Sequence, residues 1–221
     1  MSVARRAVAE LVATALLLAV VVGSGIMGER LAAGNVAIAL LANAIATGCG
    51  LAALIVTFAP ISGAHMNPVV TLALAWRGDH AWREVPAYLA AQFTGAIAGV
   101  WTAHAMFAMP LIEVSTKSRS GLPLMISEGV ATFGLLIVVL GGARHRPDAV
   151  PWTVACYITA AYWFTASTSF ANPAVTLARS MTESFAGIAP ANIAGFFAAQ
   201  LLGAVLALLA DRFFAEARAH R

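Results

Sequence analysis

Charged residues are scarce in this chain of 221 amino acids. Asp, Glu, Lys and Arg make up 10% of it, whereas a soluble domain carries roughly 25%. Hydrophobic residues make up 61%, so the composition excludes an ordinary soluble fold and predicts an integral membrane protein in a lipid bilayer. The net charge of +3 then reflects how the loops are distributed across a membrane, and no nucleic-acid partner is expected.

Cysteine is also scarce. Its two copies, Cys49 and Cys156, lie inside apolar runs, so no disulfide framework is indicated and core packing is their expected role. No cluster of His, Cys, Asp and Glu has the spacing of metal ligands, and no nucleophile stands out beside a base. The chain is therefore not expected to be an enzyme or to hold a metal or a cofactor.

Long apolar segments are plentiful. About 20 apolar residues cross a hydrocarbon core of ~30 Å as a helix, whereas barrel strands would show alternating segments of about ten residues. Gly95 and Gly99 form a G-x-x-x-G pattern, which predicts close helix packing. The six predicted helical spans are 7–27, 34–58, 86–108, 123–142, 150–170 and 192–214.

A short motif that begins with Asn-Pro occurs twice. Asn67–Trp76 (NPVVTLALAW) and Asn172–Met181 (NPAVTLARSM) are identical at six of ten positions. Asn is a favoured helix N-cap and Pro suits the first helical position. Ten residues make a helix of about 15 Å, half of the hydrocarbon core. Each copy is therefore predicted to be a half-membrane helix with its N-terminus inside the bilayer; the alternative is a pair of amphipathic surface helices.

Two longer patterns recur around this motif. Ala9–Gly23 matches Ser127–Gly141 at nine of fifteen positions, and Ala87–Val100 aligns with Gly195–Leu208. Because the three patterns keep the same order, each half of the chain should contain three spans and one half-helix. An odd number of spans turns the second half upside down, which predicts an inverted repeat with its functional site at the membrane midplane.

The predicted repeats are residues 1–108 and 123–221, joined by a loop at 109–122 within a single transmembrane domain. With both termini in the cytoplasm, nine of the 13 Lys and Arg residues fall on the inner side, as the positive-inside rule requires. We therefore predict a multi-pass protein of the cell (inner) membrane with cytoplasmic N- and C-termini.

Two carboxylates lie deep in predicted spans. Glu10 and Glu128 occupy equivalent places in the two repeats and would be costly in contact with lipid. We expect them to accept backbone N–H groups from the irregular segments before the half-helices, and Gln92 and Gln200 to brace the same segments. The alternative is a carboxylate pair that serves an enzyme or a proton transporter.

The segments before the half-helices, Thr57–Met66 and Ser167–Ala171, are rich in Gly, Ser, Thr or Pro. Irregular backbone at membrane depth persists only where protein buries it or where it lines water, so these segments are predicted to line a pore. His65 either lines the cytoplasmic half of that pore or is buried and bonded to a carbonyl.

These features together resemble the aquaporins, the major intrinsic protein family: two Asn-Pro half-helices, the run AHMNPVVT, Glu in spans one and four, and Gln in spans three and six. The resemblance covers nearly the whole chain, although the first motif is NPV in place of NPA. It implies an all-α fold of six transmembrane helices and two re-entrant half-helices, and a homotetramer with one pore in each protomer.

The resemblance also implies a passive channel for water and small neutral solutes such as glycerol-like polyols. Two facing helix N-termini, with about half a positive charge each, would repel cations, and the Asn side chains would offer NH2 donors to a solute. The predicted midplane residues are Asn67, Pro68, Val69, Asn172, Pro173 and Ala174. A secondary transporter with inverted repeats is the alternative function.

In this family an outer filter of four positions selects the solute, and the resemblance assigns them to Thr47, Ala160, Ser169 and Val175. Val175 stands where water-selective and glycerol-conducting members carry Arg. All four side chains are small or medium, so a wide constriction is predicted. The pattern is similar to bacterial members linked to arsenic handling, which implies arsenous acid or other metalloid hydroxides as solutes.

Arg179 lies one helical turn beyond Val175 on the same face of the second half-helix. The filter charge is therefore predicted to lie further out, in the extracellular vestibule. The alternative is that Arg179 only forms a salt bridge with Glu183, four residues further on.

Overall fold

The computed structural model describes residues 1–219 and the side chains of residues 1–215. Residues 220 and 221, the end of the second predicted repeat and the C-terminus, lie outside the described part. The described residues form helices and no strand. The α-helices are α1 (Val3–Leu31), α2 (Val36–Ser62), α3 (Pro68–Arg77), α4 (Val85–Met106), α5 (Leu122–His145), α6 (Val150–Phe164), α7 (Pro173–Arg179) and α8 (Ile193–Ala219). Short 3-10 turns, η1 (Trp82–Glu84), η2 (Pro147–Ala149) and η3 (Pro190–Asn192), precede α4, α6 and α8.

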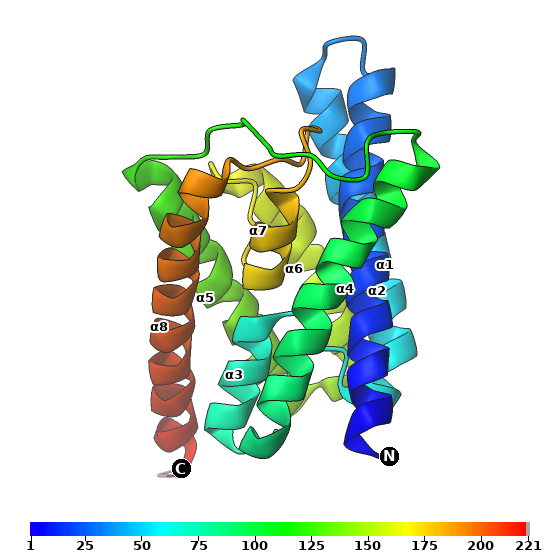
Figure 1. Cartoon of the computed structure of the whole chain (residues 1–221). Coiled ribbons are helices and arrows are strands. Elements are labelled where there is room, and N and C mark those ends of the chain that lie inside the picture. The colour runs from blue at the N-terminus through cyan, green and yellow to red at the C-terminus, as the bar shows by residue number, and fades with distance from the viewer. Residues whose placement is uncertain (220–221) are drawn as a thin grey trace.

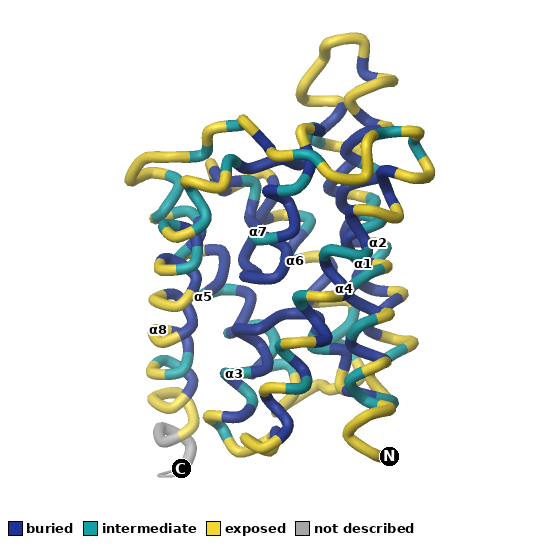
Figure 2. Tube along the Cα trace, in the orientation of Figure 1, coloured by how far each residue is buried: buried dark blue, intermediate teal, exposed yellow. Residues whose placement is uncertain are grey.

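Six helices surround the two short ones, α3 and α7, which occupy the middle of the bundle (Figure 1). α3 extends from the centre toward the end that holds the N-terminus, and α7 extends toward the opposite end (Figure 1). The central segments are buried, whereas the surrounding helices alternate between buried inner faces and exposed outer faces (Figure 2). The predicted all-α architecture with two re-entrant half-helices is confirmed.

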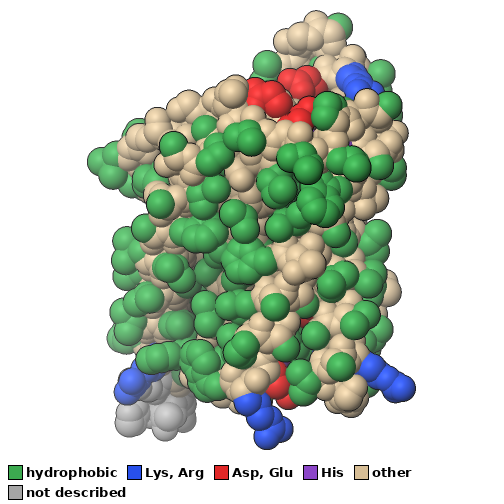
Figure 3. Space-filling model, viewed as in Figure 1, with side chains coloured by type: hydrophobic (Ala, Val, Ile, Leu, Met, Phe, Trp, Pro, Cys, Tyr) green, Lys and Arg blue, Asp and Glu red, His purple; other side chains and the backbone are tan. Residues whose placement is uncertain are grey.

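The outer surface is suited to lipid. A broad band of apolar side chains covers the visible side of the molecule, and charged side chains gather near its two ends (Figure 3). Four stretches are apolar and long enough by themselves to cross a membrane: α1, α2, α5 and Pro190–Ala215. α4 and α6 are not among them, and they pack against α1 and α2 in the bundle.

Two predicted boundaries are wrong. The fifth span was predicted to run from 150 to 170, but α6 ends at Phe164 and irregular backbone follows as far as the second half-helix. The segment Thr57–Met66 was predicted to be irregular, but α2 continues through Pro60 to Ser62 and ends at Gly63, whose φ of 95° reverses the chain. Pro60 removes one of the last backbone hydrogen bonds of α2, and the helix ends two residues later.

Glycine lets the long helices approach within backbone contact. A Cβ added to Gly95 would lie 2.3 Å from the carbonyl oxygen of Leu11, and one added to Gly99 would lie 2.2 Å from that of Ala15. The G-x-x-x-G pattern therefore packs α4 directly on the backbone of α1. Gly203, the equivalent of Gly95, gives α8 the same approach to α5.

We expect Gly99→Val to destabilise the protein by about 1–3 kcal/mol, because the added side chain forces α4 away from α1. Gly141→Val is the matched control, since a Cβ there meets nothing within 4 Å. Thermal unfolding in detergent, followed by size-exclusion fluorescence, measures both variants. Equal unfolding temperatures for the two would contradict the tight α1–α4 contact.

Candidate functional site

The two segments that lead into the half-helices have an unusual backbone conformation. Ala64 and Met66 in the first segment have φ of 50° and 47°, and Thr168, Ser169 and Ala171 in the second have φ of 63°, 51° and 48°. Non-glycine residues rarely adopt this left-handed region, and each costs of the order of 1–3 kcal/mol unless its surroundings hold it in place.

Glu10 holds the first segment. Its carboxylate is fully buried and accepts the backbone N–H of His65 at 2.9 Å and that of Met66 at 2.7 Å. The hydroxyl of Ser62 and the side-chain amide of Gln92 donate to the same carboxylate at 2.7 and 2.9 Å. Four donors thus satisfy a charge that would otherwise be prohibitive at this depth.

Glu128 does the same for the second segment. It accepts the backbone N–H groups of Phe170 and Ala171 at 2.8 and 2.9 Å and the amide of Gln200 at 2.7 Å. The Gln200 amide also donates to the hydroxyl of Thr176 in α7 at 2.9 Å. Neither this carboxylate nor the one in the first repeat lines the central cavity, which favours the bracing role over a carboxylate pair that carries protons.

The two half-helices are tied together where they meet. Asn67 and Asn172 cap α3 and α7 with their side-chain oxygens. The amide of Asn67 donates to the carbonyl oxygen of Ala171 at 2.8 Å, and the amide of Asn172 donates to that of Met66, also at 2.8 Å. Each cross-link uses one of the two amide hydrogens, so one donor on each Asn is left for a solute.

One cavity lies inside the bundle, between the two re-entrant segments. Its walls are mainly apolar, and both Asn67 and Asn172 line it. The other predicted midplane residues, Pro68, Val69, Pro173 and Ala174, are buried in the first turns of the half-helices and are not part of the lining. The polar side chains of the lining are Thr47, His65, Asn67, Tyr162, Ser169, Asn172 and Arg179.

Three of the four predicted filter residues share this cavity. Thr47, Ser169 and Val175 line it, and the hydroxyl of Ser169 is buried without a hydrogen-bond partner. The assignment of Ala160 has to be corrected, because this residue is exposed on the outer side of α6. Its position was derived by counting back from Asn172. Residues 165–172 are irregular, so a fixed number of residues does not determine which face of α6 a side chain occupies.

Tyr162, two residues beyond Ala160 in α6, faces the cavity. It lines the cavity together with Ile158, one turn earlier in α6, and its hydroxyl lies 3.1 Å from that of Thr47. The cavity wall thus includes a large side chain that the predicted set of small and medium filter residues does not contain. The i, i+4 spacing of Ile158 and Tyr162 is the sequence signal that could have identified this inner face of α6.

Arg179 also lines the cavity and is almost fully buried. Its Nε donates to the carbonyl oxygen of Ala186, and its guanidinium carbon lies 3.5 Å from the centre of the Phe170 ring. The alternative salt bridge with Glu183 is not formed, since that carboxylate accepts instead from the backbone and hydroxyl of Thr116. Two hydrogen bonds from Thr116 lower the pKa of Glu183.

In the first re-entrant segment, His65 lines the cavity wall. Its Nδ1 lies 3.0 Å from the hydroxyl of Thr71, so its partner is a hydroxyl and the alternative of a bond to a carbonyl is wrong. The His65 ring also packs against His80 and Tyr88, with ring centres 5.0 and 5.2 Å away.

His80 lies in the loop between α3 and η1 and belongs to a small polar cluster with Arg6 and Glu84. Burial lowers its pKa below the ordinary value, an effect that the carboxylate of Glu84 opposes and the guanidinium of Arg6 supports. Arg6 and Glu84 form an ion pair at 2.5 Å, which ties the start of α1 to the start of α4. The cluster therefore packs against the His65 ring through His80.

The sequence and the fold have known counterparts. Residues 1–148 match the model of the family described as major intrinsic protein. The chain is 54% identical over 212 residues to a protein named aquaglyceroporin AqpS from Rhizobium meliloti (strain 1021), which covers 96% of this chain and 91% of that protein. It is 34% identical over 193 residues to aquaporin NIP2-3 from Zea mays, covering 83% and 62% of the two chains. An X-ray structure of the aquaglyceroporin from Plasmodium falciparum superimposes with a TM-score of 0.72 at 18% identity over 96% of both chains, so the fold is shared.

We expect Glu128→Gln to destabilise the fold by about 1–3 kcal/mol, because both carboxylate oxygens accept hydrogen bonds and the new NH2 group would face a donor. Asp148→Asn removes one charge from an exposed ion pair with Arg146 and should change little. Thermal unfolding in detergent compares the two variants. An unfolding temperature of Glu128→Gln equal to that of the wild type would refute the bracing role.

Proposed function

The chain belongs to the major intrinsic protein family, and we propose that its central cavity is the pore of this passive membrane channel. Channels of this family conduct water and glycerol-type solutes and are not enzymes. The observation that carries the proposal is the pair Asn67 and Asn172, which are cross-linked where two helix N-termini meet and which line the cavity.

Where Asn67 and Asn172 meet, the channel binds the oxygen atoms of solutes and repels cations. Each Asn has one amide hydrogen left for a passing solute, and the positive ends of α3 and α7 add to that donor field. A water that accepts from these donors points its own hydrogens away from the midplane on both sides. The file of waters therefore has no continuous proton path through the centre.

Solute selection belongs to the outer end of the pore. Val175 leaves space where a longer side chain would project, and Arg179, one turn further out, supplies guanidinium donors to the same cavity. Thr47 and Tyr162 add two hydroxyls on the opposite helices, α2 and α6. This combination accommodates solutes that carry several hydroxyls, such as glycerol-like polyols, arsenous acid and other metalloid hydroxides.

The chain forms one channel domain built of inverted repeats, 1–108 and 123–221, with the loop 109–122 between them. The N-terminus and the described end of α8 lie on the same side of the bundle (Figure 1), which supports cytoplasmic termini in the cell (inner) membrane. Family resemblance supports a homotetramer in which each protomer carries its own pore.

Stopped-flow light scattering on proteoliposomes tests the function directly. Shrinkage and reswelling report the permeability of water, glycerol and arsenous acid, with protein-free liposomes as the baseline. We expect all three to pass without saturation. A protein that passes water but excludes the other two would refute the selection described here, and saturable uptake driven by an ion gradient would identify a secondary transporter.

We expect Val175→Arg to narrow the outer end and to lower the ratio of glycerol to water permeability by about tenfold, which corresponds to about 1.4 kcal/mol. Val175→Ile adds one methylene without a charge and is the matched control. The same light-scattering assay measures both ratios. An unchanged ratio in Val175→Arg would place this side chain outside the selecting region.

We expect Arg179→Met to lower the same ratio by about fivefold, because the glycerol hydroxyls lose donors worth about 1 kcal/mol. Proton leak, measured with a pH-sensitive dye inside the liposomes, should rise because a buried positive charge has been removed. Arg179→Lys keeps the charge and should retain the low leak. If Arg179→Met changes only the unfolding temperature, this residue has no role in selection.

A further inference from the structure

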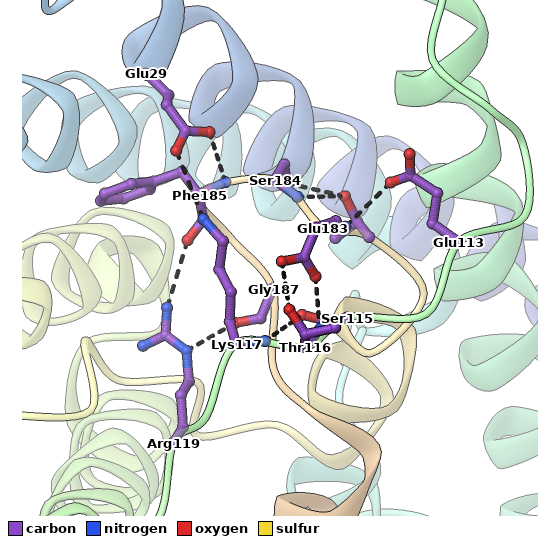
Figure 4. Close-up of polar contacts among 11 residues, drawn as sticks. Glu29, Glu113, Ser115, Thr116, Lys117, Arg119, Glu183, Ser184, Phe185 and Gly187 are labelled. Atoms are coloured by element: carbon purple, nitrogen blue, oxygen red, sulfur yellow. Dashed lines mark hydrogen bonds and ion pairs between the residues drawn. The ribbon is translucent and has the colours of Figure 1, made fainter. Parts of the chain in front are cut away.

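The irregular segment between α4 and α5, residues 107–121, crosses the end of the bundle opposite the N-terminus (Figure 1). It is tied along its length to the segment between α7 and α8 (Figure 4). The backbone N–H of Ser115 donates to the carbonyl of Ser180 at 2.9 Å, and Thr116 donates twice to Glu183 at 2.6 and 2.8 Å. The segment that joins the two repeats is therefore held in place over the outer mouth.

Arg119 reaches from this segment toward Phe185 and Gly187 (Figure 4). Its Nε donates to the carbonyl oxygen of Gly187 at 2.8 Å, and its two terminal nitrogens donate to those of Ser167 and Phe185 at 3.3 and 3.4 Å. Among the residues whose side chains are described, no carboxylate forms an ion pair with it. One guanidinium thus fastens both the second re-entrant segment and the segment that follows α7.

Arg119 and Arg179 share an aromatic ring. The guanidinium carbon of Arg119 lies 5.1 Å from the centre of the Phe170 ring, and that of Arg179 lies 3.5 Å from it. Phe170 itself lines the cavity and meets Phe196 of α8 edge-to-face at 5.0 Å. Cation–π contacts of this kind are stronger where water is excluded.

The two arginines also share a backbone segment. The carbonyl oxygens of Phe185 and Gly187 accept from Arg119, whereas that of Ala186, between them, accepts from Arg179. Three consecutive carbonyls therefore alternate between the two guanidinium groups. The position of one guanidinium cannot change without moving either this backbone or the shared ring.

We propose that Arg119 is a positioning residue of the solute filter, which fixes the Ala186 carbonyl and the Phe170 ring so that Arg179 presents its donors to the pore in one orientation. The segment that joins the repeats is then part of the selective machinery. This inference depends on the proposed role of Arg179 in solute selection.

The test compares Arg119→Met with Lys117→Met in proteoliposomes. Lys117 lies on the same segment and pairs with Glu29 at 3.5 Å, but no contact joins it to Phe170 or Arg179 among the described side chains. We expect Arg119→Met to lower the ratio of glycerol to water permeability by at least about twofold, in the same direction as Arg179→Met. Lys117→Met should leave the ratio unchanged. Equal ratios in the two variants would overturn the inference.

A double-mutant cycle separates positioning from a direct contact with the solute. In the Arg179→Met background, Arg119→Met should have no further effect on the ratio, because the group that it positions is gone. A full additional effect would mean that Arg119 acts by itself and would overturn the inference. If Arg179→Met alone has no effect on the ratio, the proposed role of Arg179 fails, and with it the inference that depends on it.

Arg119→Lys covers the case in which Arg119→Met does not fold. It keeps the charge but loses the planar fork that reaches three carbonyls. We expect the ratio to fall in the same direction, with water permeability and unfolding temperature close to those of the wild type. A wild-type ratio in Arg119→Lys would overturn the inference, because charge alone would then suffice.

Discussion

Two buried carboxylates make the rest of this structure possible. A pore at the membrane midplane needs polar backbone exposed to its interior, and the chain provides it in two segments with left-handed residues. Such segments would refold into helix or collapse without partners, because nothing else in a bilayer satisfies their N–H groups. Glu10 and Glu128 accept those groups from behind, outside the cavity. Hydrogen bonds reduce the cost of these charges at this depth, since each carboxylate accepts at least three of them, and the cavity lining contains no carboxylate.

Features that depend on local chemistry could be predicted from the sequence. Asn-Pro specifies a capped helix start wherever it occurs, so α3 and α7 begin at the expected residues. The duplication of Glu10 at Glu128 indicated a bracing role, because an equivalent place in two repeats implies an equivalent environment. The apolar segments fixed the number of spans, although α6 has only 15 residues and by length alone would not qualify as a span.

Features that depend on how irregular backbone turns could not be predicted. Ala160 was located by counting residues, but the count crosses a stretch in which several φ values change sign, so Tyr162 faces the cavity instead. Helical periodicity did place Arg179 on the same face as Val175. The contacts that hold Arg179 come from Phe170 and Ala186, which lie on two different irregular segments, and no periodic pattern predicts where such segments meet.

The partners of Arg119 and Arg179 explain how two positively charged guanidinium groups are accommodated at the outer end of the cavity. A carboxylate would satisfy either guanidinium, but it would also neutralise the charge and create a site that attracts cations. Carbonyl oxygens and an aromatic ring satisfy the donors while leaving the net charge in place. Among the described side chains no carboxylate forms an ion pair with either guanidinium, although Glu29, Glu113 and Glu183 lie on the neighbouring outer segments. In the proposed pore a neutral solute meets hydrogen-bond donors, whereas a cation also meets the positive ends of α3 and α7.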